Sequence, residues 1–123
     1  MGNPIVWADI PVTDMARASA FYAAVTGRTV APMPGGGAEV AVIAGDEGQT
    51  NAVSADLFKG GKPSHDGATV YLGAGGDIDG MLVRVSEAGG RILQEKQFMG
   101  DMVGWIAFIE DTEGNRIGIQ QPG

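Results

Sequence analysis

The chain has 123 residues, the usual size of one compact domain. Apolar residues make up 44% and charged residues 19%, as in ordinary globular proteins rather than disordered ones. The formal net charge is -7 at pH 7 and the basic residues form no run, which argues against nucleic acid or a membrane surface as a partner. No apolar stretch approaches the roughly 18 residues of a spanning helix, and the first residues lack signal-peptide features, so we expect a cytoplasmic protein.

Cysteine is absent and His65 is the only histidine. This excludes a disulfide framework, a thiolate nucleophile and any zinc or iron–sulfur site built on cysteine. A metal site made of two or three imidazoles cannot form within one chain. The glycine-rich stretch 73–76 has Ile78 where a dinucleotide-binding loop needs its third glycine. We therefore expect no cofactor.

The first half of the chain alternates short elements with glycine-containing turns. Residues 4–12 are β-branched and apolar, which predicts a strand. Apolar side chains then recur at helical spacing over 15–26, between Asp14 as N-cap and Gly27 as stop. Further strands are predicted near 28–33, 38–44 and 51–58.

The second half has the same order of elements. A strand is predicted over 68–75, and Asp77 caps an apolar stripe over 78–88 that ends at Gly89-Gly90. The remaining strands are predicted at 91–98, 103–110 and 115–120.

The two halves match in their helix signals. At an offset of 63 residues Asp14 falls on Asp77 and Gly27 on Gly90, and at an offset of 66 the later strands also match. We interpret this as a duplicated βαβββ unit in an α+β fold. The predicted single domain, 1–123, comprises modules of about 1–59 and 68–123 joined by 60–67.

Several motifs together cover nearly the whole chain. They are Ile10-Pro11-Val12-Thr13-Asp14, Ala20-Phe21-Tyr22, Ala88-Gly89-Gly90, Gly104-Trp105-Ile106-Ala107 and the run from Asp111 to Ile119. They resemble the vicinal oxygen chelate superfamily, which includes glyoxalase, bleomycin-resistance proteins and extradiol dioxygenases. The resemblance implies two tandem βαβββ modules forming a cupped mixed eight-stranded sheet. Its unpaired edge strands give a reason to expect a homodimer.

The resemblance also implies where metal ligands would stand. Metal-dependent relatives carry them on the first strand of each module and on the last strand, where this chain has Trp7, Val70 and Gly118. The fourth position falls near Ala52. None of these side chains binds a divalent ion, so the metal site is predicted to be lost.

Strand alternation assigns residues to the concave face of the predicted cup. This face is mainly apolar with a few polar groups, as in small-molecule pockets. The predicted ligand-binding residues, including Trp105 at the rim, are Trp7, Asp9, Ser54, Asp56, Val70, Leu72, Trp105, Arg116 and Gly118.

Four of the candidate residues have two interpretations each. Asp9 is either solvated or bonded to Arg116 near a strand end, or it orients a substrate or acts as a base. Asp56 is a weaker candidate for the same roles. Trp7 either fills the cup or offers a stacking face to an aromatic ligand. His65 is either a solvated loop residue or a loop acid or base that reaches over the cup.

Three functions remain open on the sequence. The first is a protein that binds an apolar or aromatic small molecule without metal. The second is an enzyme of the lyase or isomerase type, either metal-independent and using Asp9, Asp56 or His65, or with a metal held by carboxylates alone. The third is a structural or regulatory partner domain whose pocket is filled by Trp7.

Overall fold

The computed structural model describes residues 4–33, 39–45 and 54–123. The first half of the chain contributes β1 (Trp7–Val12), α1 (Met15–Thr26), β2 (Val30–Pro32), β3 (Val40–Ile43) and β4 (Ser54–Lys59). The second half contributes β5 (Val70–Gly73), α2 (Ile78–Glu87), β6 (Arg91–Phe98), β7 (Trp105–Glu110) and β8 (Arg116–Gln121). The predicted order of elements is confirmed, with strand ends shifted by a few residues.

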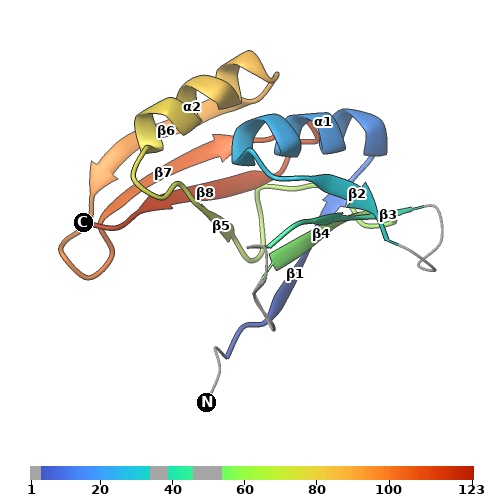
Figure 1. Ribbon diagram of the computed structural model, residues 1–123, viewed down its shortest axis with the longest axis horizontal. Coiled ribbons are helices and arrows are strands. Elements are labelled where there is room, and N and C mark those ends of the chain that lie inside the picture. Colours follow the sequence, from blue (N-terminus) through green and yellow to red (C-terminus); the bar gives the residue numbers. More distant parts are fainter. Residues whose placement is uncertain (1–3, 34–38, 46–53) are drawn as a thin grey trace.

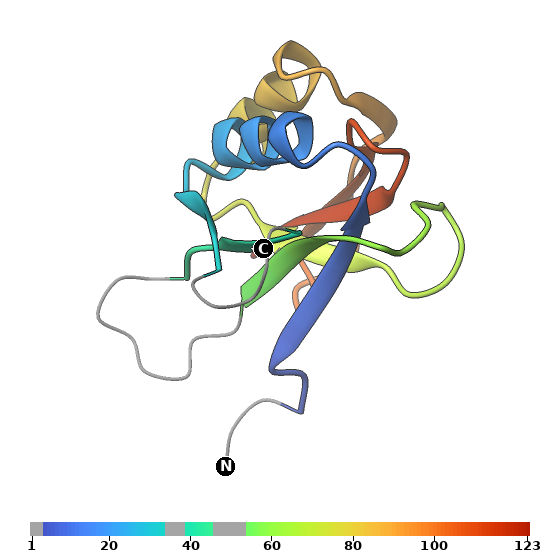
Figure 2. The ribbon, with the colours of Figure 1, turned by 90° about the vertical axis from the view of Figure 1, so that its right-hand side faces the viewer.

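The strands form two four-stranded sheets of matching topology, in the orders β1-β4-β3-β2 and β5-β8-β7-β6. In each sheet the first and last strands of the half pair in parallel, and the other neighbours are antiparallel. The helices α1 and α2 lie next to each other on the same side of both sheets (Figures 1 and 2). The α+β fold class with two βαβββ modules is therefore confirmed.

Both predicted N-caps are present. The Asp14 side chain accepts a hydrogen bond from the Arg17 backbone N–H, and Asp77 accepts one from Gly80, each at 3.0 Å. Gly27 ends α1 in the left-handed region at φ 70°, which glycine adopts without strain.

One apolar core joins the two halves. It lies between the helices and one face of each sheet, where the side chains alternate with outward-facing ones. Its fully buried large side chains are Ile10, Val12, Phe21, Tyr22, Val25, Leu57, Ile78, Met81, Val85, Ile109 and Ile119. The opposite faces of the sheets remain available for other contacts.

The turn between β7 and β8 connects the second half to the first through Asp111. The Tyr22 hydroxyl donates to Asp111 Oδ2 at 2.6 Å, and Asn115 Nδ2 donates to the same oxygen at 2.9 Å. Asp111 Oδ1 accepts from the backbone N–H groups of Glu113 and Asn115. Asn115 Nδ2 also donates to the Pro11 carbonyl at 2.7 Å. This part of the family motif stabilises the fold.

Glu113 in the same turn binds the N-terminus of α1. Its Oε1 accepts from the backbone N–H groups of Thr13 and Asp14 at 2.8 Å, and its Oε2 accepts from Arg17 Nε at 2.7 Å. Burial by itself would raise the pKa of Glu113. The hydrogen bonds described above and one from Thr112 have the larger effect, and together they lower the pKa of Glu113 to about 2.

Candidate functional site

On the first sheet, the face opposite the helices carries four of the predicted residues. Ile10 on β1 is buried in the core at 1% exposure, so the alternate positions Trp7 and Asp9 face away from it. In the parallel β1–β4 pair Trp7 aligns with Ser54 and Asp9 with Asp56. The structure thus places two aligned carboxyl groups next to an indole.

Asp56 is the buried member of this group, with 6% of its surface exposed. Trp7 Nε1 donates a hydrogen bond to Asp56 Oδ2 at 2.9 Å. Asp56 Oδ1 has no hydrogen-bond partner and is the one such buried side-chain atom in the described part of the chain. Burial and the neighbouring Asp9 raise the pKa of Asp56, and the bond from Trp7 lowers it by less.

On the second sheet the predicted face of Val70 and Leu72 is wrong. Val70 aligns with Ile117 and Leu72 with Ile119, and both isoleucines are buried in the core. Val70 and Leu72 therefore pack against the core cluster. The offset of 63 residues, which is taken from the helices, does not hold for this strand. The number of residues between the core-facing side chains of the strand and the N-cap of the following helix differs by one between the two halves of the chain. A shift of one residue moves every side chain of a strand to the other face.

Tyr71 takes the outward face in their place. It aligns with Gly118, and a Cβ atom at Gly118 would lie 2.3 Å from Tyr71 Cδ2, so the ring covers this glycine. The ring also contacts Phe108 edge-on, with centroids 5.9 Å apart. Any side chain larger than hydrogen at Gly118 would displace Tyr71.

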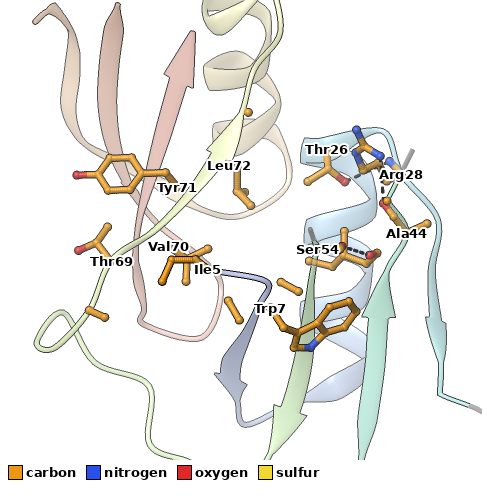
Figure 3. A pocket seen from close by; sticks show the side chains of 16 residues that line it. Ile5, Trp7, Thr26, Arg28, Ala44, Ser54, Thr69, Val70, Tyr71 and Leu72 are labelled. Carbon is orange, nitrogen blue, oxygen red and sulfur yellow. Dashed lines mark hydrogen bonds between the residues drawn. The ribbon is translucent and has the colours of Figure 1, made fainter. Parts of the chain in front are cut away.

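A hollow of about 580 Å³ lies where the two sheets approach each other, and we call it the seam hollow (Figure 3). Val70 and Leu72 of β5 lie on one side, and Ser54 and Trp7 of the first sheet lie on the other (Figure 3). Four predicted ligand-binding residues therefore line one space. The other lining residues with large or polar side chains are Ile5, Thr26, Arg28, Ile43, Thr69 and Tyr71.

Asp9 and Arg116 lie outside the seam hollow. Both border a smaller hollow of about 90 Å³ together with Lys62 and Asp66. Arg116 donates to Thr69 Oγ1 at 2.9 Å, and its guanidinium lies 4.0 Å from the centroid of Phe108. Arg116 is thus engaged on the second sheet.

Two further candidates are separate from the seam hollow. The Trp105 ring packs against Phe98 with centroids 5.2 Å apart, and Lys96 Nζ lies 4.9 Å above it. His65 Nε2 lies 2.6 Å from Glu110 Oε2 in an exposed hydrogen bond. His65 itself is not among the residues that border the small hollow with Asp9, although its neighbours Ser64 and Asp66 are.

The positions implied for a metal do not fit one. The only polar atom of the Trp7 side chain is an N–H donor, Val70 has no donor atom, and Gly118 is covered by Tyr71. Ala52 lies outside the described residues. Over residues 4–33, 39–45 and 54–123, no three His, Cys, Asp or Glu side chains come close enough to hold an ion.

The fold agrees with a family match over residues 4–119 to the Glyoxalase/Bleomycin resistance protein/Dioxygenase superfamily. The chain belongs to this superfamily. No curated protein matches it in sequence. None of the helices in the described part of the chain is long and apolar enough to span a membrane.

Solved structures show the same fold at low sequence identity. A glyoxalase/bleomycin resistance protein from Albidiferax ferrireducens T118 has TM-score 0.76 and 17% identity, covering 98% of this chain and 100% of that one. Hypothetical protein SA1046 from S. aureus has TM-score 0.70 and 23% identity, covering 94% of each chain. TnmS3, an antibiotic binding protein from Streptomyces sp. CB03234, has TM-score 0.65 and 22% identity, covering 99% and 98%.

Sequence reasoning missed several residues that line the seam hollow, among them Thr26, Arg28 and Tyr71. Thr26 is the last residue of α1 and Arg28 follows its C-cap, and both reach the seam hollow only through tertiary packing. Tyr71 could have been predicted from the sequence, since it is an aromatic residue between the predicted site residues Val70 and Leu72 on one strand.

Proposed function

We propose that this protein binds a small apolar or aromatic molecule in the seam hollow without a metal ion. The volume of about 580 Å³ lies within the range of small-molecule pockets. Both halves of the chain contribute apolar side chains, and a few polar groups border them. The observation that carries the proposal is Trp7, which is 40% exposed and lines the hollow while its N–H is bound by Asp56.

The metal-free part of the proposal rests on the side chains at the positions implied for ligands. Isothermal titration with zinc, nickel, manganese and ferrous ions is expected to show no stoichiometric binding. Tight one-to-one binding that is lost in an Asp9→Ala, Asp56→Ala double variant would favour a carboxylate-held metal and contradict this part.

TnmS3, a protein of the same fold, is an antibiotic binding protein, which supports the proposal of binding for this chain. For this protein we propose reversible binding of a mainly apolar compound. Stacking on an indole suits a planar aromatic ring, because the ring faces offer large contact area.

The experiment uses N-phenyl-1-naphthylamine, a neutral aromatic probe, titrated into the protein and followed by its fluorescence. Trp7→Ala is expected to weaken binding by roughly 1 to 3 kcal/mol with the fold retained. Met99→Ala is the matched control, because Met99 lines a separate hollow of about 560 Å³ on the second sheet. A larger loss in Met99→Ala than in Trp7→Ala would move the binding site to that hollow.

If Trp7 fills the cup, the same Trp7→Ala variant would instead lose roughly 3 to 5 kcal/mol of stability through the cavity it leaves. Thermal unfolding therefore separates this outcome from loss of a ligand contact. An unchanged melting temperature together with unchanged probe affinity would exclude both roles.

A second candidate function is metal-independent acid–base catalysis. It is favoured by Asp56, a buried carboxyl group whose pKa is raised and which has one unpaired oxygen. A base of this kind removes a proton next to a carbonyl, and the proton exchanges with solvent. NMR of small carbonyl compounds in deuterium oxide should then show deuterium uptake that disappears in Asp56→Asn.

We also propose a homodimer, supported by the edge strands β1 and β5, each of which has a sheet neighbour on one side only. Ile5 and Val6 before β1 are 68% and 66% exposed. The chain before β1 runs away from the helices (Figure 1). Light scattering after size exclusion tests this, and a monomer at high concentration would contradict it.

A further inference from the structure

The orientation of the Trp7 indole depends on one long-range hydrogen bond. Trp7 starts β1, and the two residues before it are exposed, so little packing holds the ring from the N-terminal side. Its only polar atom, Nε1, donates to Asp56 Oδ2, which is 49 positions away in the sequence. The bond crosses diagonally from β1 to β4, because Trp7 itself aligns with Ser54.

A carboxylate is a costly acceptor at this place. Burying a charge without full pairing is unfavourable, and Asp56 Oδ1 has no donor. A neutral acceptor would bind the indole N–H at lower cost. The Ser54 hydroxyl, although aligned with Trp7, donates to the backbone carbonyl of Ile43, and the indole N–H donates to Asp56 instead. What the carboxylate supplies is a charge-assisted bond, which is roughly twice as strong as a neutral one.

We infer that Asp56 is a positioning residue that holds the Trp7 indole in the orientation in which its ring lines the seam hollow, and that protonation of Asp56 weakens this hold. The inference rests on the proposed function, because it assigns a purpose to the ring at the hollow. It makes binding of an aromatic ligand dependent on pH.

The groups around Asp56 set the direction of this dependence. On β1 the charged neighbour is Asp9, and on β3 the aligned residue is the uncharged Val42. The helices pack on the opposite face of the sheet. Asp9 in turn borders the small hollow that also contains Lys62, Asp66 and Arg116. Burial and Asp9 together raise the pKa of Asp56, so it gains its proton in milder acid than an ordinary aspartate.

The test uses a Trp105→Phe background, in which Trp7 is the single tryptophan. Asp56→Asn keeps an acceptor oxygen but cannot titrate, and Asp56→Leu removes the acceptor while keeping the branch at Cγ. Glu87→Gln at the exposed end of α2 is the control for loss of one negative charge. Circular dichroism checks that each variant is folded, and Asp56→Asn keeps the test valid if Asp56→Leu is unstable.

Two readouts are followed from about pH 4 to pH 8, a range that covers a raised aspartate pKa. The first is affinity for N-phenyl-1-naphthylamine, and the second is the NMR signal of the single indole N–H. With Asp56 intact, affinity is expected to fall about threefold on acidification as the charge-assisted bond becomes neutral. Asp56→Asn should show this lower affinity at every pH, and Asp56→Leu should bind about tenfold more weakly than the parent.

The indole signal should shift with pH in the parent and in Glu87→Gln, and should be constant in Asp56→Asn. Asp9→Asn should move the midpoint of the shift to lower pH. An indole signal that is unchanged over the range, or full affinity in Asp56→Leu, overturns the inference. If the parent does not bind the probe, the proposed function fails, and the indole signal alone still decides whether Asp56 holds Trp7.

Discussion

Glu113 and Asp56 both have buried side chains, but their surroundings shift the pKa of the two carboxyl groups in opposite directions. Both oxygens of Glu113 accept hydrogen bonds, and its pKa is lowered to about 2. Asp56 has one bonded and one unpaired oxygen, and its pKa is raised. The first group stabilises the fold in its charged form, and the second costs stability in that form. This contrast separates a residue that serves folding from one that we assign to the site.

The difference follows from the position of each residue in its element. Glu113 lies in a turn opposite the N-terminus of α1, where backbone N–H groups have no partner within the helix. Asp56 lies in the middle of β4, where the backbone N–H groups are used by neighbouring strands. Only a side chain can donate to Asp56, and the structure provides one, from Trp7.

The largest expected effect is at Glu113. Its folded pKa of about 2 lies below the ordinary value of 4.5, so its contribution is present above pH 4.5 and is lost as the pH falls toward 2. Glu113→Gln should lower the free energy of unfolding at neutral pH by about 3 kcal/mol. Denaturant unfolding at several pH values measures this, with Glu95→Gln on the exposed face of β6 as control. Equal loss in both variants would mean that Glu113 has no special role.

Asp111 should give the next largest effect. Each of its oxygens accepts two hydrogen bonds. In Asp111→Asn one of these oxygens is replaced by an N–H₂ group, which cannot accept from the two donors that face it. We expect a loss of about 2 kcal/mol in unfolding free energy. The Tyr22→Phe change made in both backgrounds isolates the hydroxyl contact. Additive losses would show that this contact does not depend on the Asp111 charge.

Asp56→Asn is expected to act in the opposite direction. A raised pKa means that Asp56 is favourable to the fold when protonated and unfavourable as the pH rises through its folded pKa. Removing the charge should therefore raise the unfolding free energy at neutral pH by roughly 1 kcal/mol. The gain should disappear in acid. A loss of stability at neutral pH would place Asp56 in the same class as Glu113.

Asp9→Asn sharpens the contrast with the smallest effect. Asp9 is exposed, so its own removal should change stability by no more than about 0.5 kcal/mol. Its effect should be seen in the titration of Asp56, whose pKa should return toward the ordinary value because a neighbouring charge is gone. The carboxyl carbon signal of Asp56 in NMR reports this, and an unmoved midpoint would leave burial as the only cause.

The sequence by itself determined the elements and their order. Helix caps at Asp14 and Asp77, the stop at Gly27 and the strand stretches are local signals, because a cap or an apolar period needs only a few neighbouring residues. The family motifs then indicated how these elements are arranged, and the fold class followed.

The tertiary structure decided the composition of the site. Which face Val70 and Tyr71 occupy depends on a single residue of spacing between strand and cap, and a strand reverses its faces with each such step. The Trp7–Asp56 bond joins positions 49 apart, and the end of α1 reaches the hollow only because the helix packs against the first sheet. Whether a buried carboxyl group finds all its donors is a property of three-dimensional neighbours, which sequence periodicity does not encode.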